Sequence, residues 1–312
     1  MKFLKPQFWD KNQLSFFAIL LFPISILIQV LNFFKNIFNK KYDFNIPVIC
    51  VGNIYLGGTG KTPICIELFN ILKNLNKNPV FIRKKYNSYK DEIDLLKNIG
   101  PTYEEKKRVN AINAAINNNA DVAILDDGFQ DRSIKKDLSI VCFNEKQWIG
   151  NGLTIPSGPL REGLPALKRA DFVIINGNKN DVIENKILKN NQSIKIFYIK
   201  YLPSNINEFK NKKVISFAGI GNPDNFFNVL KKNNVDLIEQ ISFPDHYNYS
   251  NLEIENLIKK SQDGNIILLT TEKDFMRIPE KYKKYFKYLK IKIEIENKDY
   301  FTKELKKIYE NY

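Results

Sequence analysis

The feature that most constrains the fold of this chain is a glycine-rich turn between an apolar segment and a helical one. The run VICVGNIYLGGTGKTP occupies residues 48–63. Glycine has no Cβ and adopts positive φ at little cost, so Gly57, Gly58 and Gly60 allow backbone N–H groups to surround phosphate oxygens. The start of the following helix adds its partial positive charge. This order of strand, turn and helix is typical of a phosphate-binding loop.

The same turn carries the polar groups that a nucleoside triphosphate needs. Lys61 is expected to neutralise the β- and γ-phosphates, and Thr62 to give its hydroxyl to Mg²⁺. The full GxxxxGK[ST] pattern is not met, because Tyr55 stands at its first glycine. The predicted nucleotide-binding residues of the loop are Gly57, Gly58, Thr59, Gly60, Lys61 and Thr62.

A second motif, ADVAILDDGFQD at residues 120–131, reads as an apolar strand that ends in two acids. In P-loop enzymes a carboxylate at the end of a strand holds Mg²⁺ directly or through water. Asp126 or Asp127 is the candidate for this role. Many strands end in Asp, so the prediction depends on the pairing of this motif with GGTGKT.

Short apolar runs alternate with polar helical stretches after Asp43, which predicts a parallel α/β sheet with crossover helices. The expected fold is a P-loop NTPase-like, mostly parallel sheet with helices on both faces, plus a second, smaller α/β domain. The expected division is a membrane-associated segment (1–41), a P-loop domain (42–204) and a C-terminal α/β domain (205–312). Strands are expected at 46–51, 79–83, 121–126, 138–143, 171–176, 194–200, 214–217, 235–243, 265–270 and 288–295. Helices are expected at 62–75, 104–116, 224–232, 251–260, 300–309 and near 273–285.

The N-terminal end contains no charged residue from Asn12 to Phe34. An apolar run of about 20 residues has the length of a membrane-spanning helix, but Pro23 interrupts it, and proline can kink or break a helix. A transmembrane span, a helix lying in the bilayer interface and a buried core helix are the alternative interpretations. Lysines dominate the charge of residues 1–41, so this end could contact an anionic leaflet.

Composition narrows the function classes. The formal net charge is +14, which indicates anionic partners, but the charge is spread along the chain and nucleic acid is not expected as a partner. The chain has one histidine, His246, which excludes a three-histidine zinc centre. Its three cysteines form no CxxC motif, so neither a disulfide framework nor a cysteine zinc site is expected.

Two classes of P-loop protein remain open on these residues. One is a kinase for a small or lipid acceptor; the other is a membrane-associated ATPase switch of the partitioning or positioning type. The switch also uses GGxGKT near the N-terminus, usually with a lysine directly before the two glycines. Leu56 stands at that position here, which favours the kinase.

Seven runs occur in a fixed order along the chain: VGNIYLGGTGKTP, LDDGFQD, GNGLTIPSGPLRE, LKRADFVIING, FAGIGNP, FPDHY and TEKD. From about Pro47 to Asp274 the chain thereby resembles the tetraacyldisaccharide 4'-kinase family. The resemblance implies transfer of the γ-phosphoryl group of ATP, with Mg²⁺, to the 4'-hydroxyl of a tetraacyldisaccharide 1-phosphate in lipid A biosynthesis. It also implies an anionic acylated disaccharide as substrate, contact with membrane lipid at the cytoplasmic face of the inner membrane, and no obligate protein partner.

The resemblance also assigns roles to single residues. In GPLRE, Arg161 matches a phosphate clamp and Glu162 a metal-side acid. His246 of FPDHY matches the catalytic histidine of the family, which works with an aspartate to activate the acceptor hydroxyl. Lys61 completes the predicted catalytic set.

The aspartate partner of the histidine is where this chain departs from the family pattern. The run RKKYNSYKDEIDLL at residues 83–96 lacks the glycine and the proline of the family and is shorter. Asp91 is the best match, and Asp94 is the alternative. The loops around Gly219 and Glu272–Asp274 are expected to handle the acceptor, to form a hinge or to be plain turns.

Overall fold

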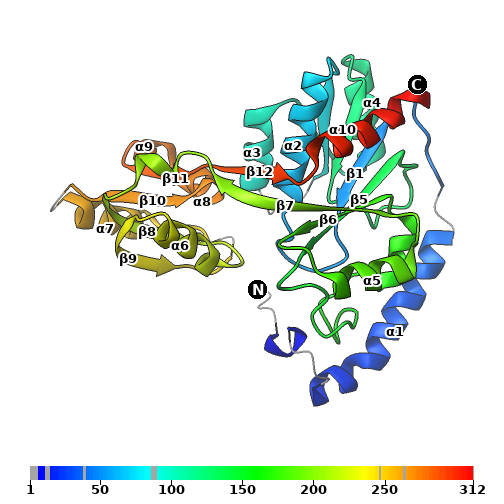
Figure 1. Ribbon diagram of the computed structural model, residues 1–312, viewed down its shortest axis with the longest axis horizontal. Coiled ribbons are helices and arrows are strands. Elements are labelled where there is room, and N and C mark those ends of the chain that lie inside the picture. Colours follow the sequence, from blue (N-terminus) through cyan, green and yellow to red (C-terminus); the bar gives the residue numbers. More distant parts are fainter. Residues whose placement is uncertain are drawn as a thin grey trace. The chain divides into compact units, whose positions relative to one another are not determined.

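The computed structural model describes residues 6–10, 15–37, 40–85, 90–245, 247–262 and 265–311. The chain forms two compact units (Figure 1). Unit 1 comprises Met1–Lys85, Gly100–Lys200 and Glu294–Tyr312, and unit 2 comprises Tyr86–Ile99 and Tyr201–Ile293.

Unit 1 is built on an eight-stranded sheet with the order β12-β7-β6-β5-β1-β4-β2-β3. The pairs from β7 to β3 are all parallel. The strands are β1 (Val48–Gly52), β2 (Pro79–Lys84), β3 (Thr102–Glu105), β4 (Val122–Asp126), β5 (Leu138–Asn144), β6 (Phe172–Asn176), β7 (Lys195–Pro203) and β12 (Ile291–Ile295). The boundary between the units falls within β7 and within β12. The predicted mostly parallel α/β sheet is confirmed.

The two central strands explain where the polar motifs meet. All five residues of β1 and of β4 are buried, as expected for strands covered on both faces, which read as continuous apolar runs. Val51 of β1 lies opposite Asp126 of β4. The carboxyl ends of both strands therefore share one edge of the sheet, where ligands of open α/β folds bind.

Helices cover both faces of this sheet. Successive side chains of a strand point to opposite faces, so the apolar side chains of these strands need a helix on each side. On one face, α4 (Arg108–Asn117) and α5 (Asp181–Asn190) belong to the same apolar cluster as Val80 and Ile82 of β2. On the other face, Phe69 of α2 (Lys61–Asn74) stacks on Phe81 with ring centroids 4.8 Å apart. Near the C-terminus, α10 (Lys298–Lys306) packs against this sheet through Phe301 (Figure 1).

Unit 2 has its own parallel sheet, with the order β11-β10-β8-β9. Its strands are β8 (Lys213–Ala218), β9 (Asp236–Ser242), β10 (Ile267–Thr271) and β11 (Phe286–Leu289). Its helices are α3 (Lys90–Ile99), α6 (Pro223–Lys232), α7 (Asn251–Gln262), α8 (Glu272–Arg277) and α9 (Glu280–Lys283). Side chains of α6 pack in one apolar cluster with Val214 and Ala218 of β8. Side chains of α7 pack in a second cluster with Ile215 and Phe217 of the same strand.

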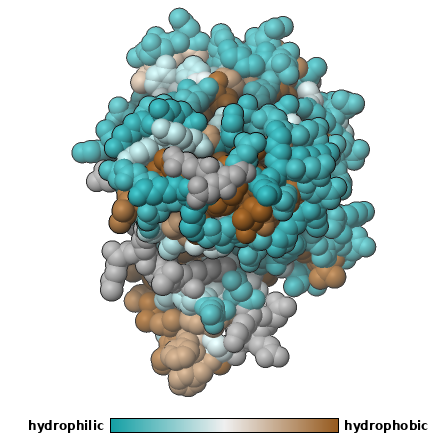
Figure 2. Space-filling view, turned by 90° about the vertical axis from the view of Figure 1, so that its left-hand side faces the viewer, coloured by the Kyte–Doolittle hydropathy of each residue, from teal (hydrophilic) through white to brown (hydrophobic). Residues whose placement is uncertain are grey.

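The apolar N-terminal run forms one long helix, α1 (Phe16–Ile37), after the short helix η1 (Gln7–Trp9). Pro23 lies inside α1 without ending it. Most large apolar side chains of α1 are exposed, which argues against a core helix, and its length and composition suffice to cross a membrane. Figure 2 shows hydrophobic surface gathered at the lower end of the molecule, the level at which α1 and η1 lie in Figure 1.

Among the strands and α-helices of the described residues, β3, α3 and α5 were not predicted. The sequence of β3 is TYEE, which carries no apolar alternation because the strand lies at the edge of the sheet. The helices α3 and α5 have ten residues each and are largely polar, so their pattern resembles that of a solvated loop. The single strand expected at 288–295 is instead two strands, β11 and β12, which belong to different sheets.

The contacts divide the chain differently from the predicted domain limits. Residues 294–312 were expected in the C-terminal domain, but they belong to unit 1 because β12 joins the large sheet beside β7. The backbone N–H of Glu296 donates to the carbonyl of Tyr198 at 2.9 Å. Residues 86–99 were expected in the P-loop domain, but they belong to unit 2, where α3 packs on α8.

Candidate active site

The predicted phosphate loop lies between the end of β1 at Gly52 and the start of α2 at Lys61. Gly57 has φ +143° and Gly60, the N-cap of α2, has φ +87°. Any residue with a Cβ would be strained at these two positions. At Gly58 a Cβ would meet no atom within 4 Å, so this glycine leaves open space beside the loop. The predicted order of strand, turn and helix is confirmed.

Asn53, which the sequence did not single out, ties the loop together from inside. Its buried side chain donates from Nδ2 to the Thr59 hydroxyl at 2.9 Å and to the Gly57 carbonyl at 3.2 Å. Gln130 in turn donates to the carbonyl of Asn53 at 2.8 Å. Thr59 therefore faces the interior of the loop, and the loop is held in shape by the protein itself. The sequence feature that could have indicated this role is the position of Asn53, a polar residue directly after the apolar strand β1.

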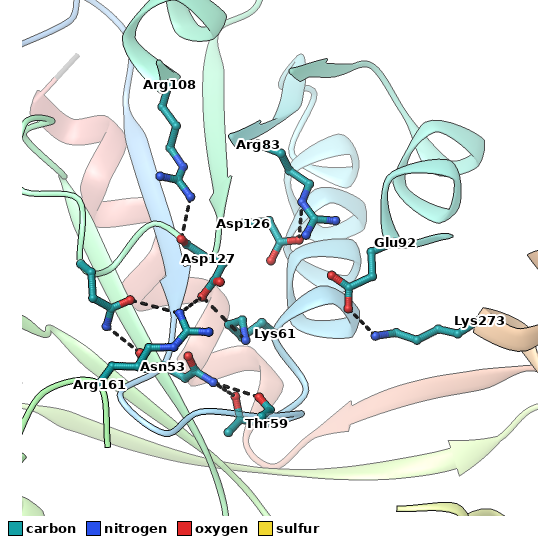
Figure 3. A network of polar contacts seen from close by, with 12 residues as sticks. Asn53, Thr59, Lys61, Arg83, Glu92, Arg108, Asp126, Asp127, Arg161 and Lys273 are labelled. Atoms are coloured by element: carbon teal, nitrogen blue, oxygen red, sulfur yellow. Dashed lines mark hydrogen bonds and ion pairs between the residues drawn. The ribbon is translucent and has the colours of Figure 1, made fainter. Parts of the chain in front are cut away.

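Lys61, Asp127 and Arg161 form a charged group beside the loop (Figure 3). Asp127 Oδ1 lies 2.8 Å from Arg161 Nη1 and 3.7 Å from Lys61 Nζ. Burial raises the pKa of Asp127, but the charges of Lys61 and Arg161 outweigh it and hold that pKa below its ordinary value. Asp127 is therefore a carboxylate at neutral pH, and it has cations on two sides.

The neighbouring acid, Asp126, has different surroundings. It is 2% exposed, and its Oδ2 lies 3.4 Å from Nε of Arg83, at the end of β2 (Figure 3). Arg83 is itself buried. A charge that is removed from water is costly unless an opposite charge lies close to it. In unit 1 the positive charge of Arg83 and the negative charge of Asp126 compensate each other in this way. Arg83 was not predicted as a site residue, although it lies near the end of β2 and Asp126 ends β4.

Arg108 is a further buried cation that the sequence did not single out. It donates from Nη2 to the Asp127 carbonyl at 2.7 Å and from Nη1 to Asp131 Oδ2 at 3.2 Å. Asp127 has a positive φ of 58°, a region that non-glycine residues visit rarely. Arg108 thus holds the backbone of Asp127 in the conformation that turns this side chain toward Lys61.

Arg161 and Glu162 follow one another in the chain but have separate partners. Arg161 Nη1 also donates to Gln130 Oε1 at 3.3 Å, so it joins the group around the loop. Glu162 Oε2 accepts from Arg132 at 3.2 Å and from Arg169 at 2.7 Å. The contacts of Glu162 are therefore those of an ion-pair cluster, and its predicted metal role stays a prediction.

The other predicted metal ligands are Thr62, Asp126 and Asp127. In the described part of the chain no three His, Cys, Asp or Glu side chains gather into a ready metal site. Mg²⁺ is usually bound by one or two carboxylates together with substrate phosphates and water. The hydroxyl of Thr62 and the carboxylates at the end of β4 are oxygen donors of the required kind.

The predicted acceptor-side residues belong to unit 2. His246 and the side chain of Asp91 lie outside the described residues. The helix α3, which contains positions 91 and 94, is fixed to α8: Glu92 Oε1 lies 2.6 Å from Lys273 Nζ, and Asn98 Nδ2 lies 3.7 Å from Met276 Sδ.

Asp274 of the TEKD run is the centre of a buried hydrogen-bond network in unit 2. It is fully buried, and it accepts from Gly219 N at 3.0 Å, Tyr249 Oη at 2.8 Å and Thr271 Oγ1 at 2.6 Å. Arg277 Nη1 lies 3.0 Å from it. The network joins the FAGIGNP loop to the residues that follow position 246, so the structure favours a role in shaping these loops.

Comparison with known proteins agrees with this geometry. The chain matches the family described as tetraacyldisaccharide-1-P 4'-kinase over residues 17–102 and 91–310. It is 42% identical to the tetraacyldisaccharide 4'-kinase of Pelagibacter ubique (strain HTCC1062), over 99% of each chain. It is 35% identical to that of Rickettsia bellii (strain OSU 85-389), over 89% of this chain and 90% of the relative.

A solved structure is similar along nearly the whole chain. LpxK from Aquifex aeolicus, crystallised in complex with ATP, superposes with a TM-score of 0.73 at 26% identity. The match covers 93% of this chain and 99% of that one.

Proposed function

The chain belongs to the tetraacyldisaccharide 4'-kinase family, and we propose that it transfers the γ-phosphoryl group of ATP to the 4'-hydroxyl of a tetraacyldisaccharide 1-phosphate. The observation that carries the proposal is the group of Lys61, Asp127 and Arg161 beside the phosphate loop. Its two cations share one carboxylate, which leaves the group with net positive charge where a triphosphate would bind. The similar LpxK structure holds ATP, which supports the same donor here.

We propose that the phosphates of the nucleotide bind the two cations of this group, Lys61 and Arg161. Lys61 and Arg161 are paired with Asp127 in the structure, and the phosphate oxygens would replace the carboxylate as their partner. An arginine can bind phosphate through two parallel hydrogen bonds, which would fix the direction of the γ-phosphoryl group. Catalysis of phosphoryl transfer consists mainly of such positioning and of charge neutralisation.

Mg²⁺ is the proposed cofactor, and the residues at the end of β4 fit it. Thr62, Asp126 and Asp127 supply hydroxyl and carboxylate oxygens, the ligands that Mg²⁺ prefers. A Mg²⁺ ion held by these residues would supply positive charge to neutralise the charge that develops on the phosphoryl group during transfer. Glu162 fits less well, because two arginines already occupy its Oε2.

On the acceptor side, His246 is proposed as the base that removes the proton of the 4'-hydroxyl. Asp91, or Asp94 in its place, would orient the imidazole and stabilise its charged form. A positioned base of this kind contributes roughly 10²- to 10⁴-fold to the rate.

The acylated acceptor is a lipid, so the enzyme has to work at a bilayer. The helix α1 presents exposed apolar side chains along most of its length, and we propose that it holds the protein on the inner membrane at the cytoplasmic face. A membrane-associated ATPase switch is not favoured, because the family match extends through both units.

The test is a transfer assay with detergent-solubilised protein, Mg²⁺, γ-labelled ATP and the tetraacyldisaccharide 1-phosphate. Label is expected in the lipid fraction, and Lys61→Ala is expected to abolish it while the protein stays folded. Lys73→Ala is the matched control, since Lys73 is an exposed lysine of the same helix. Hydrolysis of ATP without labelled lipid would contradict the proposed function.

A further inference from the structure

The helix α1 is apolar, yet one side of it makes specific polar contacts with unit 1. Ser25 is fully buried, and its Oγ lies 2.9 Å from the Thr154 carbonyl, 2.8 Å from Ser157 Oγ and 3.1 Å from Ser157 N. One turn further on, Gln29 Nε2 donates to Thr154 Oγ1. Because Ser25 is buried and a buried polar group is costly without partners, its hydrogen bonds fix how α1 is rotated about its axis and how far it is shifted along that axis relative to this loop.

The segment before α1 contacts the same loop, which we call the docking loop (residues 150–160). Trp9 is buried; its Nε1 donates to the Pro156 carbonyl at 3.0 Å, and its own carbonyl accepts from Asn151 N at 2.8 Å. At Gly150 a Cβ would lie 2.3 Å from the Trp9 carbonyl oxygen. The chain needs glycine there so that the two backbones can approach this closely.

The other end of the docking loop runs along the phosphate loop. Leu56 N donates to the Pro159 carbonyl at 2.8 Å, and Arg161 N donates to the Ile54 carbonyl at 2.7 Å. Only three residues separate Ser157, which contacts α1, from Arg161, which contacts Asp127. Because the connecting segment is so short, we expect a displacement of Ser157 to be transmitted to Arg161.

We propose that Ser25 and Gln29 are positioning residues, which act through the docking loop on Arg161 beside the phosphate loop. The affinity for nucleotide then depends on how α1 is docked, so that the membrane helix of this kinase also orders its ATP site. The inference rests on the proposed role of Arg161 at the phosphates, and it concerns the polar side of α1, away from the lipid-facing side chains.

The test is equilibrium binding of Mg²⁺-ATP to the full chain in detergent micelles, without acceptor. Ser25→Ala and Ser157→Ala are each expected to raise the Kd about three- to tenfold, as loss of a buried hydrogen bond predicts. Ser193→Ala is the matched control: its hydroxyl bonds Asn191 Oδ1 at 2.8 Å at an exposed site outside the docking loop. Sedimentation of Ser25→Ala with phospholipid vesicles is expected to match the wild type, because the lost hydroxyl faces protein.

Two readouts separate positioning from simple destabilisation. A partly unfolded variant has fewer binding sites at an unchanged Kd, whereas a displaced Arg161 raises the Kd itself. In an Arg161→Ala background, Ser25→Ala is expected to change the Kd less than about twofold, since residues in one pathway are not additive. An unchanged Kd in both serine variants, or the full factor in the Arg161→Ala background, overturns the inference. An unchanged Kd for Arg161→Ala alone refutes the phosphate clamp of the proposed function instead.

Discussion

Replacement of Asp127 by asparagine separates the two functions that we propose for this carboxylate. In the structure Asp127 Oδ1 lies 2.8 Å from Arg161 Nη1 and 3.7 Å from Lys61 Nζ. Both cations are also the proposed partners of the phosphates. The two proposed functions of the carboxylate are therefore competition with ATP for the cations and assistance to the metal during transfer.

The size of the competition follows from the geometry. At the distance between Asp127 and Lys61, Coulomb's law gives about 1 kcal/mol in water and roughly 4 kcal/mol at an effective dielectric constant of 20. The Asp127 side chain is 30% exposed and that of Lys61 14%, so solvent screening reduces the second figure. We expect a net effect of about 1–2 kcal/mol, which is roughly 5- to 30-fold in Kd.

The expected signature of Asp127→Asn is a tighter Kd for ATP without Mg²⁺, together with turnover at least about 100-fold lower with Mg²⁺. Calorimetric titration in EDTA and the transfer assay measure the two quantities. Asp126→Asn is the matched control, because Asp126 faces Arg83 and not Lys61, so it should not tighten ATP binding in EDTA. Weaker binding of Mg²⁺-free ATP to Asp127→Asn would refute the competition.

Three further predictions test other parts of the structure. His246→Ala should lower turnover about 10²- to 10⁴-fold with little change in ATP affinity, as measured by steady-state kinetics and nucleotide titration; unchanged turnover would make His246 structural. Phe301→Ala should destabilise unit 1 by roughly 3–5 kcal/mol in urea unfolding, because the ring is fully buried against Phe172 and Phe197; no loss would contradict the placement of the C-terminal segment in unit 1. Burial raises the pKa of Asp131, but the hydrogen bond from Ser133 and the charge of Arg108 outweigh it, and the folded pKa lies below 3.8. The stability that this group contributes is therefore present above the unfolded value and is lost as pH falls through the folded pKa. Asp131→Asn should thus flatten the acid limb of an unfolding curve below about pH 4, and an identical limb would show that the pair contributes nothing.

The parts of the site that are local in sequence could be predicted. Gly57, Gly60 and Lys61 lie within one turn, so their pattern alone indicates the phosphate loop. The central strands could also be read, since burial on both faces gives an apolar run whatever the neighbouring strands are.

The parts that depend on distant partners could not be read from the sequence. From its residue type alone Arg108 is expected at the surface, because arginine is almost never fully buried unless it is paired. Its partners, Asp131 and the carbonyl of Asp127, become visible only when α4 is placed on the sheet. The same holds for Glu162, whose neighbours Arg132 and Arg169 come from two other segments of unit 1.

The paired acids at the end of β4 show why the sequence left two candidates open. The strand β4 lies between β1 and β2 in the sheet, so a residue at its end can face a partner on either side. Asp126, still within the strand, is opposite Arg83, which lies one residue before the end of β2. Asp127 leaves the strand with positive φ and faces Lys61, which follows β1 through the phosphate loop. Of the two adjacent acids, Asp126 thus pairs with a buried arginine and Asp127 pairs with the lysine of the phosphate loop.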